Sequence, residues 1–235
     1  MKNPVIELEN VSLALDGKMV LEGVTFGVER GEFFCITGPH GTGQTLLLKL
    51  CAELLPPTTG TGRRNLQPVG AEGSLMHAGF VFEYGGLISN LTVFNNIALP
   101  LRYHTSMPEE EIADKAREAL ALLNITEFSD VLPARLSVGT RKLASVARAI
   151  AMRPQIIYYD EPTLGLDRDA AQRVESVMRQ MRERGATSLV VSHSAEFVKR
   201  SAERAVVLIG GRMAGVGRVD ELSGGADPYV RNFFG

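Results

Sequence analysis

The sequence predicts an α/β protein with a mainly parallel sheet, and three observations support this class. Apolar runs of strand length alternate with segments of helical periodicity along most of the chain. One of these runs leads through a glycine-rich loop into a helix, and another ends in the acidic pair Asp160-Glu161. Helices that alternate with strands cover both faces of a parallel sheet, which explains why the strands are continuously apolar.

The N-terminal part of the chain differs, because its strands alternate between apolar and polar residues. Val5 to Leu15 and Met19 to Val28 show this pattern, and the turn residues Asp16-Gly17 separate them. Together they predict an antiparallel hairpin. Thr58 to Gly73 is rich in Gly, Thr, Arg and Pro and is expected to form loops.

The glycine-rich loop has the features of a phosphate-binding loop except for one residue. It lies between a predicted strand, Phe33 to Thr37, and a predicted helix, Thr45 to Leu50. Small residues let backbone N–H groups surround a phosphate chain at the helix N-terminus, and Thr45 supplies a hydroxyl for Mg²⁺. Gln44 stands where a lysine would reach the outer phosphates, and a plain structural turn is the alternative interpretation. The loop is Gly38-Pro39-His40-Gly41-Thr42-Gly43-Gln44-Thr45.

The middle of the chain, Leu91 to Met152, is predicted to be helical and to follow a short buried strand at Gly79 to Glu83. Ser106 and Glu109, with Pro108 between them, form a capping-box pattern that predicts a helix start. One face of the helix that follows is apolar, which predicts packing into the core. That face consists of Ile112, Ala116, Leu120 and Leu123.

The C-terminal part returns to buried strands. Ile156 to Asp160, Ser188 to Ser192 and Ala205 to Ile209 are apolar runs. A helix between the first two is predicted to end at Gly185, and Gly210-Gly211 is predicted to open a terminal hairpin. The apolar face of that helix consists of Ala170, Val174, Met178 and Met181.

Length, charge and cysteine content narrow the functional class. A chain of 235 residues suits one large domain, and 25 basic against 27 acidic residues produce no field that attracts nucleic acid. No apolar run approaches membrane-spanning length and the first residues do not form a signal peptide. We therefore expect a cytoplasmic protein whose membrane link comes through a partner. Cys35 and Cys51 are expected to be buried thiols rather than a disulfide or a metal site.

Several polar positions after the loop are candidates for chemistry. Asp160 ends a buried strand and has the chemistry to hold Mg²⁺, while Glu161 has the chemistry to polarise an attacking water. Ser137 and the Gly139 amide, at the start of a helical segment, present donors to an anion. His193 follows a strand and is a candidate contact for a γ-phosphate. Taken singly, these residues also fit a polar loop, an ordinary N-cap and an unremarkable strand-end histidine.

In this order, the motifs resemble those of the nucleotide-binding subunits of ABC transporters over essentially the full length of the chain. Asp160 to Asp167 is similar to the joined Walker B motif and D-loop of that family, Leu136 to Thr140 to its signature motif, and His193 to its switch histidine. The resemblance implies one domain over residues 1–235, with a RecA-like P-loop core, an N-terminal antiparallel β-subdomain and an inserted helical subdomain at about residues 91–152.

The resemblance also implies ligands and partners. Mg²⁺ is expected at Thr45, Glu83 and Asp160, while Glu161 and His193 are expected to be catalytic. A second copy or a paralogous ATPase subunit would form a head-to-tail dimer that closes on ATP and drives an integral membrane permease. The expected ATP contacts are Gly38, His40, Gly41, Thr42, Gly43, Gln44, Thr45, Leu46, Ser137, Gly139 and Asp167.

A narrower resemblance, to the Mla-type lipid-asymmetry or organic-solvent-resistance ATPases, lies in short tracts. These are Leu91 to Arg102, His104-Thr105 and Asp227 to Phe233. They imply a subunit on the inner face of the cell membrane, bound to a permease that moves phospholipids or similar apolar molecules. The cytoplasmic helix of that permease is expected to dock near Glu83 to Phe94.

Five positions depart from the family pattern. Gln44 replaces the lysine and Glu83 replaces a glutamine, so the site is about two charges more negative than the family norm. Loss of a charged hydrogen-bond donor weakens binding by about tenfold to a hundredfold, and loss of a charge-stabilising donor costs about 10²–10³ in rate. We therefore expect weak nucleotide binding that depends strongly on Mg²⁺. The other departures are Leu15, Val138 and Thr140.

These departures leave three hypotheses for Gln44. The chain hydrolyses ATP slowly, it is the degenerate partner of a competent subunit, or Gln44 is an engineered change. Two rival functions stand beside a transporter ATPase. One is a nucleotide-sensing or scaffolding subunit without turnover, and the other is an ABC protein of DNA repair or translation. The coiled-coil arms, zinc insertions or tandem ATPase units usual in the latter are not visible in the sequence.

Overall fold

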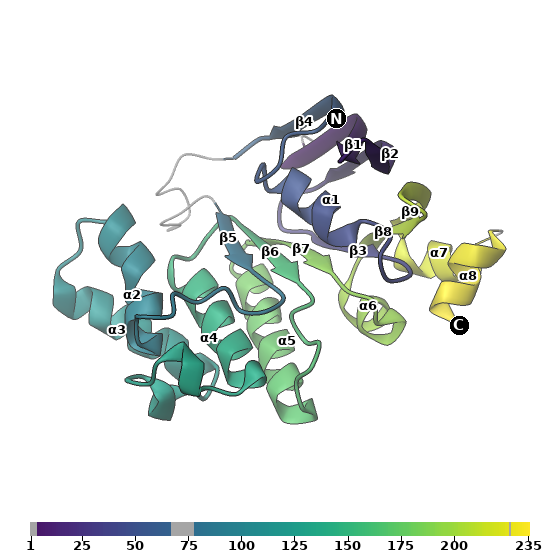
Figure 1. The fold of residues 1–235 in the computed structure, drawn as a ribbon. Coiled ribbons are helices and arrows are strands. Elements are labelled where there is room, and N and C mark those ends of the chain that lie inside the picture. Colours follow the sequence, from purple (N-terminus) through teal and green to yellow (C-terminus); the bar gives the residue numbers. More distant parts are fainter. Residues whose placement is uncertain (1–3, 67–77, 226) are drawn as a thin grey trace. The chain divides into compact units, whose positions relative to one another are not determined.

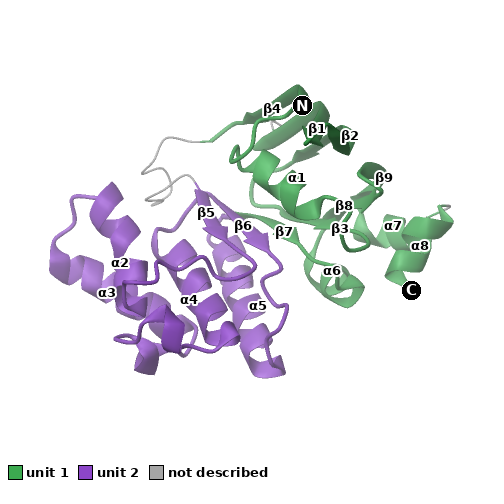
Figure 2. Ribbon diagram, viewed as in Figure 1, with its two compact units in different colours: residues 1–66, 187–235 green, residues 67–186 purple. Residues whose placement is uncertain are grey.

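The structure is a computed structural model that describes residues 4–66, 78–225 and 227–235 (Figure 1). The chain divides into two compact units (Figure 2). Unit 1 comprises residues 1–66 and 187–235, and unit 2 comprises residues 67–186. The organisation as one domain with a helical subdomain stays a prediction.

Unit 1 contains a three-stranded antiparallel sheet in the order β2-β1-β4. Strands β1 (Ile6–Leu15) and β2 (Lys18–Val28) form the predicted hairpin. The turn residues Asp16 and Gly17 both have positive φ, 49° and 75°, which suits the right-handed twist of two paired strands. The hairpin prediction is confirmed.

Strand β4 (Thr59–Arg64) corrects the sequence-based expectation of loops in this region. It pairs antiparallel with β1, with Ile6 opposite Arg64. The strand shows no apolar alternation because five of its six residues are exposed at the sheet edge, so only its pairing with β1 defines it. Residues 67–73 of the expected loop lie outside the described residues.

The second sheet of unit 1 is mainly parallel and follows the order β7-β3-β8-β9. The central strand β3 pairs parallel with β7 and β8, while β9 runs antiparallel to β8. Gly210 and Gly211, both at positive φ, form the predicted turn between β8 and β9. These strands are β3 (Phe33–Thr37), β7 (Thr187–Val191), β8 (Arg204–Ile209) and β9 (Arg212–Arg218).

Helices cover this sheet, and its core is apolar. Every residue of β3 and β7 is buried, as expected for strands with helices on their faces. Cys35 and Cys51 are buried thiols as predicted, and burial raises the pKa of Cys51. The helices of unit 1 are α1 (Gln44–Cys51), α6 (Ala195–Ser201), α7 (Val219–Gly224) and α8 (Pro228–Phe234).

Unit 2 combines a strand pair with a group of helices. Strands β5 (Ala78–Val81) and β6 (Ile156–Asp160) are parallel, and α4 lies against β5 and beside α5 (Figure 1). The predicted apolar face around Leu120 is buried, which confirms that it packs into the core. The helices are α2 (Val93–His104), α3 (Glu109–Leu122), α4 (Val138–Ala151) and α5 (Arg168–Glu183), with short 3₁₀ turns η2 (Thr126–Phe128) and η3 (Pro133–Arg135).

The helix ends of unit 2 confirm one prediction and correct another. Gly185, at φ 90°, ends α5 as predicted, and its N–H donates to the Arg182 carbonyl. The predicted capping box at Ser106 is wrong. Helix α3 begins after Pro108 without a side-chain cap, and its first turn carries three glutamates that favour the positive end of the helix dipole.

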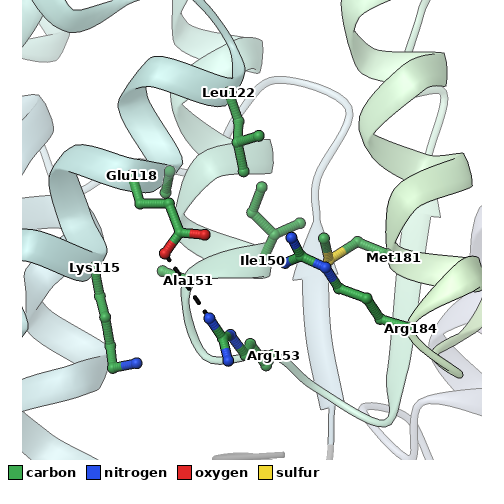
Figure 3. Close-up of a pocket in the computed structure, with 9 residues that line it drawn as sticks. Lys115, Glu118, Leu122, Ile150, Ala151, Arg153, Met181 and Arg184 are labelled. Carbon is green, nitrogen blue, oxygen red and sulfur yellow. Dashed lines mark ion pairs between the residues drawn. The ribbon is translucent and has the colours of Figure 1, made fainter.

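A small hollow lies where α3 meets the C-terminal ends of α4 and α5 (Figure 3). The hollow has a volume of about 20 Å³, room for roughly one water. Glu118 and Arg153 form an ion pair at 3.9 Å across it, and Lys115 lines it from α3.

The observed elements confirm the predicted α/β class, with mainly parallel strands, an N-terminal antiparallel sheet and an inserted helical segment. Among the described residues, no helix combines the length and apolarity that crossing a bilayer requires.

Candidate functional site

The glycine-rich loop of unit 1 is fixed by contacts to β8 that only small residues permit. Gly38 has φ 133°, and a Cβ at this position would lie 2.1 Å from the Leu208 carbonyl oxygen. The Thr42 hydroxyl donates to the Pro39 carbonyl at 3.0 Å and to the Leu208 carbonyl at 3.2 Å. These contacts hold the loop against β8.

The loop leads directly into the first turn of α1. Gly41 and Gly43 have φ values of 76° and 97°, and Gly43 is the N-cap of the helix. The first intrahelical bond runs from Leu47 N–H to the Gly43 carbonyl. The first amides of a helix have no intrahelical acceptor and carry partial positive charge, so this end of α1 suits an anion. Thr45 and Leu46 are half-buried in this turn.

Gln44 is bound into the loop. Its side chain is 3% exposed, and its Nε2 donates to the Pro39 carbonyl at 2.8 Å. The amide therefore closes the loop on itself and brings no charge. Residues 38–45 contain neither lysine nor arginine. Backbone dipoles are consequently the chief electropositive feature of this stretch.

Two histidines meet at the loop. Nδ1 of His193, just after β7, lies 2.8 Å from the Gly38 carbonyl oxygen. That oxygen only accepts, so Nδ1 donates in this contact. The rings of His193 and His40 lie 3.7 Å apart between centroids. The fold thus brings the predicted His193 to the loop, although 155 residues separate it from Gly38.

The predicted carboxylates of unit 2 lie at the end of β6. Asp160 and Glu161 are 3% and 7% exposed. Glu161 has φ 48°, an unusual value for a residue with a side chain, and its carbonyl accepts from Leu164 N–H at 3.3 Å. The same segment ends at Asp167, which caps α5 by accepting from Ala170 N–H at 2.8 Å.

Lys142, on α4, contacts this turn. Sequence reasoning did not identify it as a site residue. It is 2% exposed, and its Nζ donates to the carbonyls of Glu161 and Leu164, each at 2.7 Å. The available signal was its spacing, because Lys142 falls four residues before Val146 on the buried face of α4. A lysine in an apolar stripe needs buried acceptors.

Electrostatics link Lys142 to the predicted metal ligands of unit 2. Burial lowers the pKa of Lys142, and the charges of Glu161, Glu83 and Asp160 oppose that shift. A hydrogen bond to Glu83 raises the pKa of the exposed Tyr84, and the charges of Glu83 and Asp160 raise it further. The charges of Glu161, Glu83 and Asp160 all reach Lys142, so the three carboxylates lie in the same part of unit 2.

The residues predicted for Mg²⁺ have suitable donor chemistry. Magnesium usually takes one or two carboxylates and completes its shell with phosphate oxygens and water. Asp160 and Glu83 supply carboxylates in unit 2, and Thr45 supplies a hydroxyl in unit 1. Within residues 4–66, 78–225 and 227–235, no group of three or more His, Cys, Asp or Glu side chains is arranged to hold a metal by itself.

Leu136 to Thr140, the signature segment, contributes Ser137 to Thr140 to the lining of a hollow in unit 2. Ser137 caps α4, because its hydroxyl accepts from Thr140 N–H at 3.0 Å. Val138 is 54% exposed at this helix start. The hollow, about 560 Å³, is lined by residues 137–140 and 165–167 and by Arg173. The structure therefore brings the predicted Ser137, Gly139 and Asp167 to one pocket.

A glycine-rich loop between a buried strand and a helix N-terminus is the arrangement of the P-loop class of phosphate-binding proteins, here with Gln44 in place of the lysine. The particular family follows from sequence comparison. The family model described as "ABC transporter" matches residues 21–164. The chain belongs to this family and is an ATPase of the ABC type.

Relatives and solved structures agree with this assignment. The L-cystine transport system ATP-binding protein TcyN of Escherichia coli is 33% identical over 95% of this chain and 93% of its own length. The methionine import ATP-binding protein MetN of Chlamydia pneumoniae is 31% identical, over 98% of this chain and 70% of its own. A dimeric post-hydrolysis structure of the ATP-binding cassette MJ0796, bound to ADP and Pi, matches with a TM-score of 0.82 at 29% identity, over 91% of this chain and 98% of that one.

Proposed function

We propose that this chain is the ATP-hydrolysing subunit of an ABC transporter. The observation that carries the proposal is the Gly38–Thr45 loop, whose conformation presents the N-terminus of α1 to an anion. The solved MJ0796 structure, a dimer bound to ADP and Pi, supports ATP as the ligand and a dimer as the working form, and we take that dimer to be head-to-tail. The second subunit is another copy or a paralogue, and its P-loop would share ATP with Ser137, Gly139 and Asp167 of this chain.

The chemistry is phosphoryl transfer to water. The water oxygen attacks the γ-phosphorus, the bond from phosphorus to the bridging oxygen breaks, and ADP leaves with that electron pair. Glu161 accepts the proton that the water loses. With Nδ1 of His193 donating to the Gly38 carbonyl, it is Nε2 of the doubly protonated ring that donates a hydrogen bond to a γ-phosphate oxygen. Loop amides bind the phosphates, and Thr45, Asp160 and Glu83 are the residues that would hold Mg²⁺, whose charge would neutralise the phosphates.

The charge of the site makes its metal dependence unusual. Gln44 brings no cation to the phosphates, and Glu83 adds a carboxylate near Asp160. Nucleotide affinity should therefore be weak and should depend strongly on Mg²⁺. Calorimetric titration with ATP, with excess Mg²⁺ or with EDTA, measures this. Micromolar affinity in EDTA contradicts this part of the proposal.

Phosphate release from the purified chain, alone and with its permease, tests the main proposal. We expect slow release that EDTA abolishes. Nucleotide binding without any release, under both conditions, would instead support the nucleotide-sensing or scaffolding subunit. Absence of nucleotide binding would remove both functions.

An apolar groove on unit 2 supports a membrane partner. It has a volume of about 480 Å³. Tyr103 on α2 is 81% exposed and Leu99 is 37% exposed. We infer that a cytoplasmic permease helix docks here and holds the chain at the inner face of the membrane. The residues that line the groove lie outside Glu83 to Phe94, the segment where the sequence predicts docking, and in that segment Tyr84 is 80% exposed. Co-purification of the permease should be lost in Tyr103→Glu and kept in Tyr229→Glu, whose parent residue is 73% exposed on α8.

The cargo hypothesis has less support than the assignment as a transporter ATPase. Phospholipid or other apolar cargo rests only on the tracts near Leu91–Arg102 and Asp227–Phe233. TcyN and MetN are named for cystine and methionine, which are amino acids rather than lipids. The proposal therefore stops at a transporter ATPase. ATP turnover by the complete transporter, measured with phospholipid vesicles and separately with cystine or methionine, decides between the two cargo classes.

A further inference from the structure

We propose that Lys142 is a positioning residue for ATP hydrolysis, and that its buried ammonium determines where the Glu161 carboxylate stands. The inference rests on the proposed function in one respect, because it takes Glu161 as the residue that accepts the proton from water. Lys142 itself would touch neither nucleotide nor the attacking water, and would act through the backbone carbonyls of Glu161 and Leu164.

The contacts of Lys142 define the role. Its Nζ donates to both ends of the Glu161–Leu164 turn, whose own closing bond, from Leu164 N–H to the Glu161 carbonyl, is longer at 3.3 Å. Hydrogen bonds from a charged donor are about twice as strong as neutral ones. The ammonium is therefore the stronger of the two clamps on this turn.

The backbone at Glu161 needs such a clamp. A positive φ is disfavoured for any residue with a Cβ, and the residue before a proline is further restricted to extended conformations. Glu161 has φ 48° and precedes Pro162, so its conformation conflicts with both preferences. Backbone strain of this kind persists only where surrounding structure enforces it. Lys142 is the buried donor that reaches both carbonyls.

The position of Lys142 also connects two parts of the proposed site. It lies on α4, five residues after Ser137, which caps that helix beside the hollow of the signature segment. A contact at the start of α4 therefore reaches Glu161 through one helical turn and one side chain. This path stays within unit 2.

Three variants test the proposal. Lys142→Met keeps the length of the chain and removes the donors, whereas Lys142→Arg keeps a cation with several N–H groups. Lys115→Met is the matched control, because Lys115 is a partly buried lysine of α3 in the same unit, beside the hollow of Figure 3. Each is measured for kcat and KM of phosphate release, for thermal unfolding, and for amide hydrogen exchange at Leu164 and Leu166.

We expect Lys142→Met to lower kcat by about 10²-fold with little change in KM, since a reacting group is displaced while the P-loop is intact. Exchange at Leu164 should rise. Lys142→Arg should recover kcat to within about tenfold of the parent, and Lys115→Met should match the parent in every measurement. The recovery by arginine separates positioning from simple packing.

Specific outcomes overturn the inference. A folded Lys142→Met with parental kcat and parental exchange shows that the clamp does not matter, and an arginine variant as slow as methionine shows that the cation does not. Should Lys142→Met unfold, Lys142→Gln, which retains one N–H₂ group, takes its place in the same comparison. If the parent chain releases no phosphate, the proposed function fails, and exchange at Leu164 still decides whether Lys142 holds the turn.

Discussion

The two strand-end turns of the site reach unusual backbone conformations by different means. After β3, the positive φ values belong to Gly38, Gly41 and Gly43, which adopt them without steric cost. After β6, the positive φ belongs to Glu161, and a buried lysine from another element holds the turn. The first conformation is one that its glycines adopt freely and that contacts with β8 then hold, whereas the second is disfavoured at Glu161 and needs a tertiary contact to enforce it.

The two turns also differ in where charge is placed. The loop of unit 1 has a neutral side chain, Gln44, bonded to its own Pro39 carbonyl. The turn of unit 2 has a cation, Lys142, whose Nζ donates to two backbone carbonyls and feels the charges of three carboxylates. In the proposed function, phosphate binding would therefore rely on backbone dipoles and metal, while the ammonium of Lys142 holds the backbone of the turn.

The largest expected effect comes from the carboxylate that the second turn presents. Glu161→Gln should lower the rate of phosphate release by about 10²–10⁴, because an amide cannot accept a proton from water. Nucleotide affinity should be retained, since the P-loop lies in the other unit. Single-turnover assays with Mg²⁺ measure the rate, and a dissociation constant from the same preparation serves as control. Unchanged release would mean that another group accepts the proton.

The next effect concerns the missing cation of the first turn. Gln44→Lys should raise nucleotide affinity by about tenfold to a hundredfold and turnover by about 10²–10³. It should also weaken the dependence of binding on Mg²⁺. Calorimetry and phosphate release report the two gains. Gln44→Leu, which loses the bond to Pro39 without adding charge, distinguishes electrostatics from loop rearrangement, and equal behaviour of both variants would contradict the charge argument.

A smaller effect tests whether the first turn is locally encoded. Gly38→Ala should destabilise the fold by roughly 3 kcal/mol or more, since its Cβ would meet the Leu208 carbonyl oxygen at 2.1 Å in a strained conformation. Gly41→Ala is the matched control. It also has positive φ but no atom within 4 Å of a Cβ, so a cost of about 1 kcal/mol is expected. Urea denaturation compares them, and equal costs would show that the contact with β8 is not limiting.

The smallest effect concerns the helix that connects the second turn to the signature segment. Ser137→Ala removes the acceptor for Thr140 N–H and should lower the free energy of unfolding by about 1 kcal/mol. Ser137→Asp keeps an acceptor and should recover that stability. If the cap also orients α4, the alanine variant should slow phosphate release more than its stability loss explains. Thermal unfolding and phosphate release, measured on the same samples, separate the two roles.

Sequence reasoning succeeded wherever a feature is local. The Gly38–Thr45 loop, the hairpin turn at Asp16-Gly17, the cap at Ser137 and the helix end at Gly185 depend on residues close in the chain. Their physical causes are glycine's freedom at positive φ and short-range capping bonds. Such features are visible in the order of residues.

Sequence reasoning was wrong where contacts with residues distant in the chain determine the local structure. Strand β4 exists because β1 supplies its hydrogen bonds, and Ser106 caps nothing because α3 begins only after Pro108. The placement of His193 at Gly38 spans 155 residues, so its strand-end position predicted only a candidate phosphate contact, to which the family resemblance added the role of a switch histidine. An exposed edge strand has no apolar alternation that distinguishes it from a loop, and no apolar pattern shows which of two neighbouring residues starts a helix.

The amino-acid order alone was enough for the α/β class, the phosphate-binding loop and the identity of the acidic pair, because glycine, apolar periodicity and carboxylate chemistry act over a few residues. Only the folded chain revealed that Gln44 is bonded to Pro39 and that Lys142 holds the backbone of Glu161. Both depend on which carbonyl is left within reach of a buried donor, and that is settled when helices and strands pack.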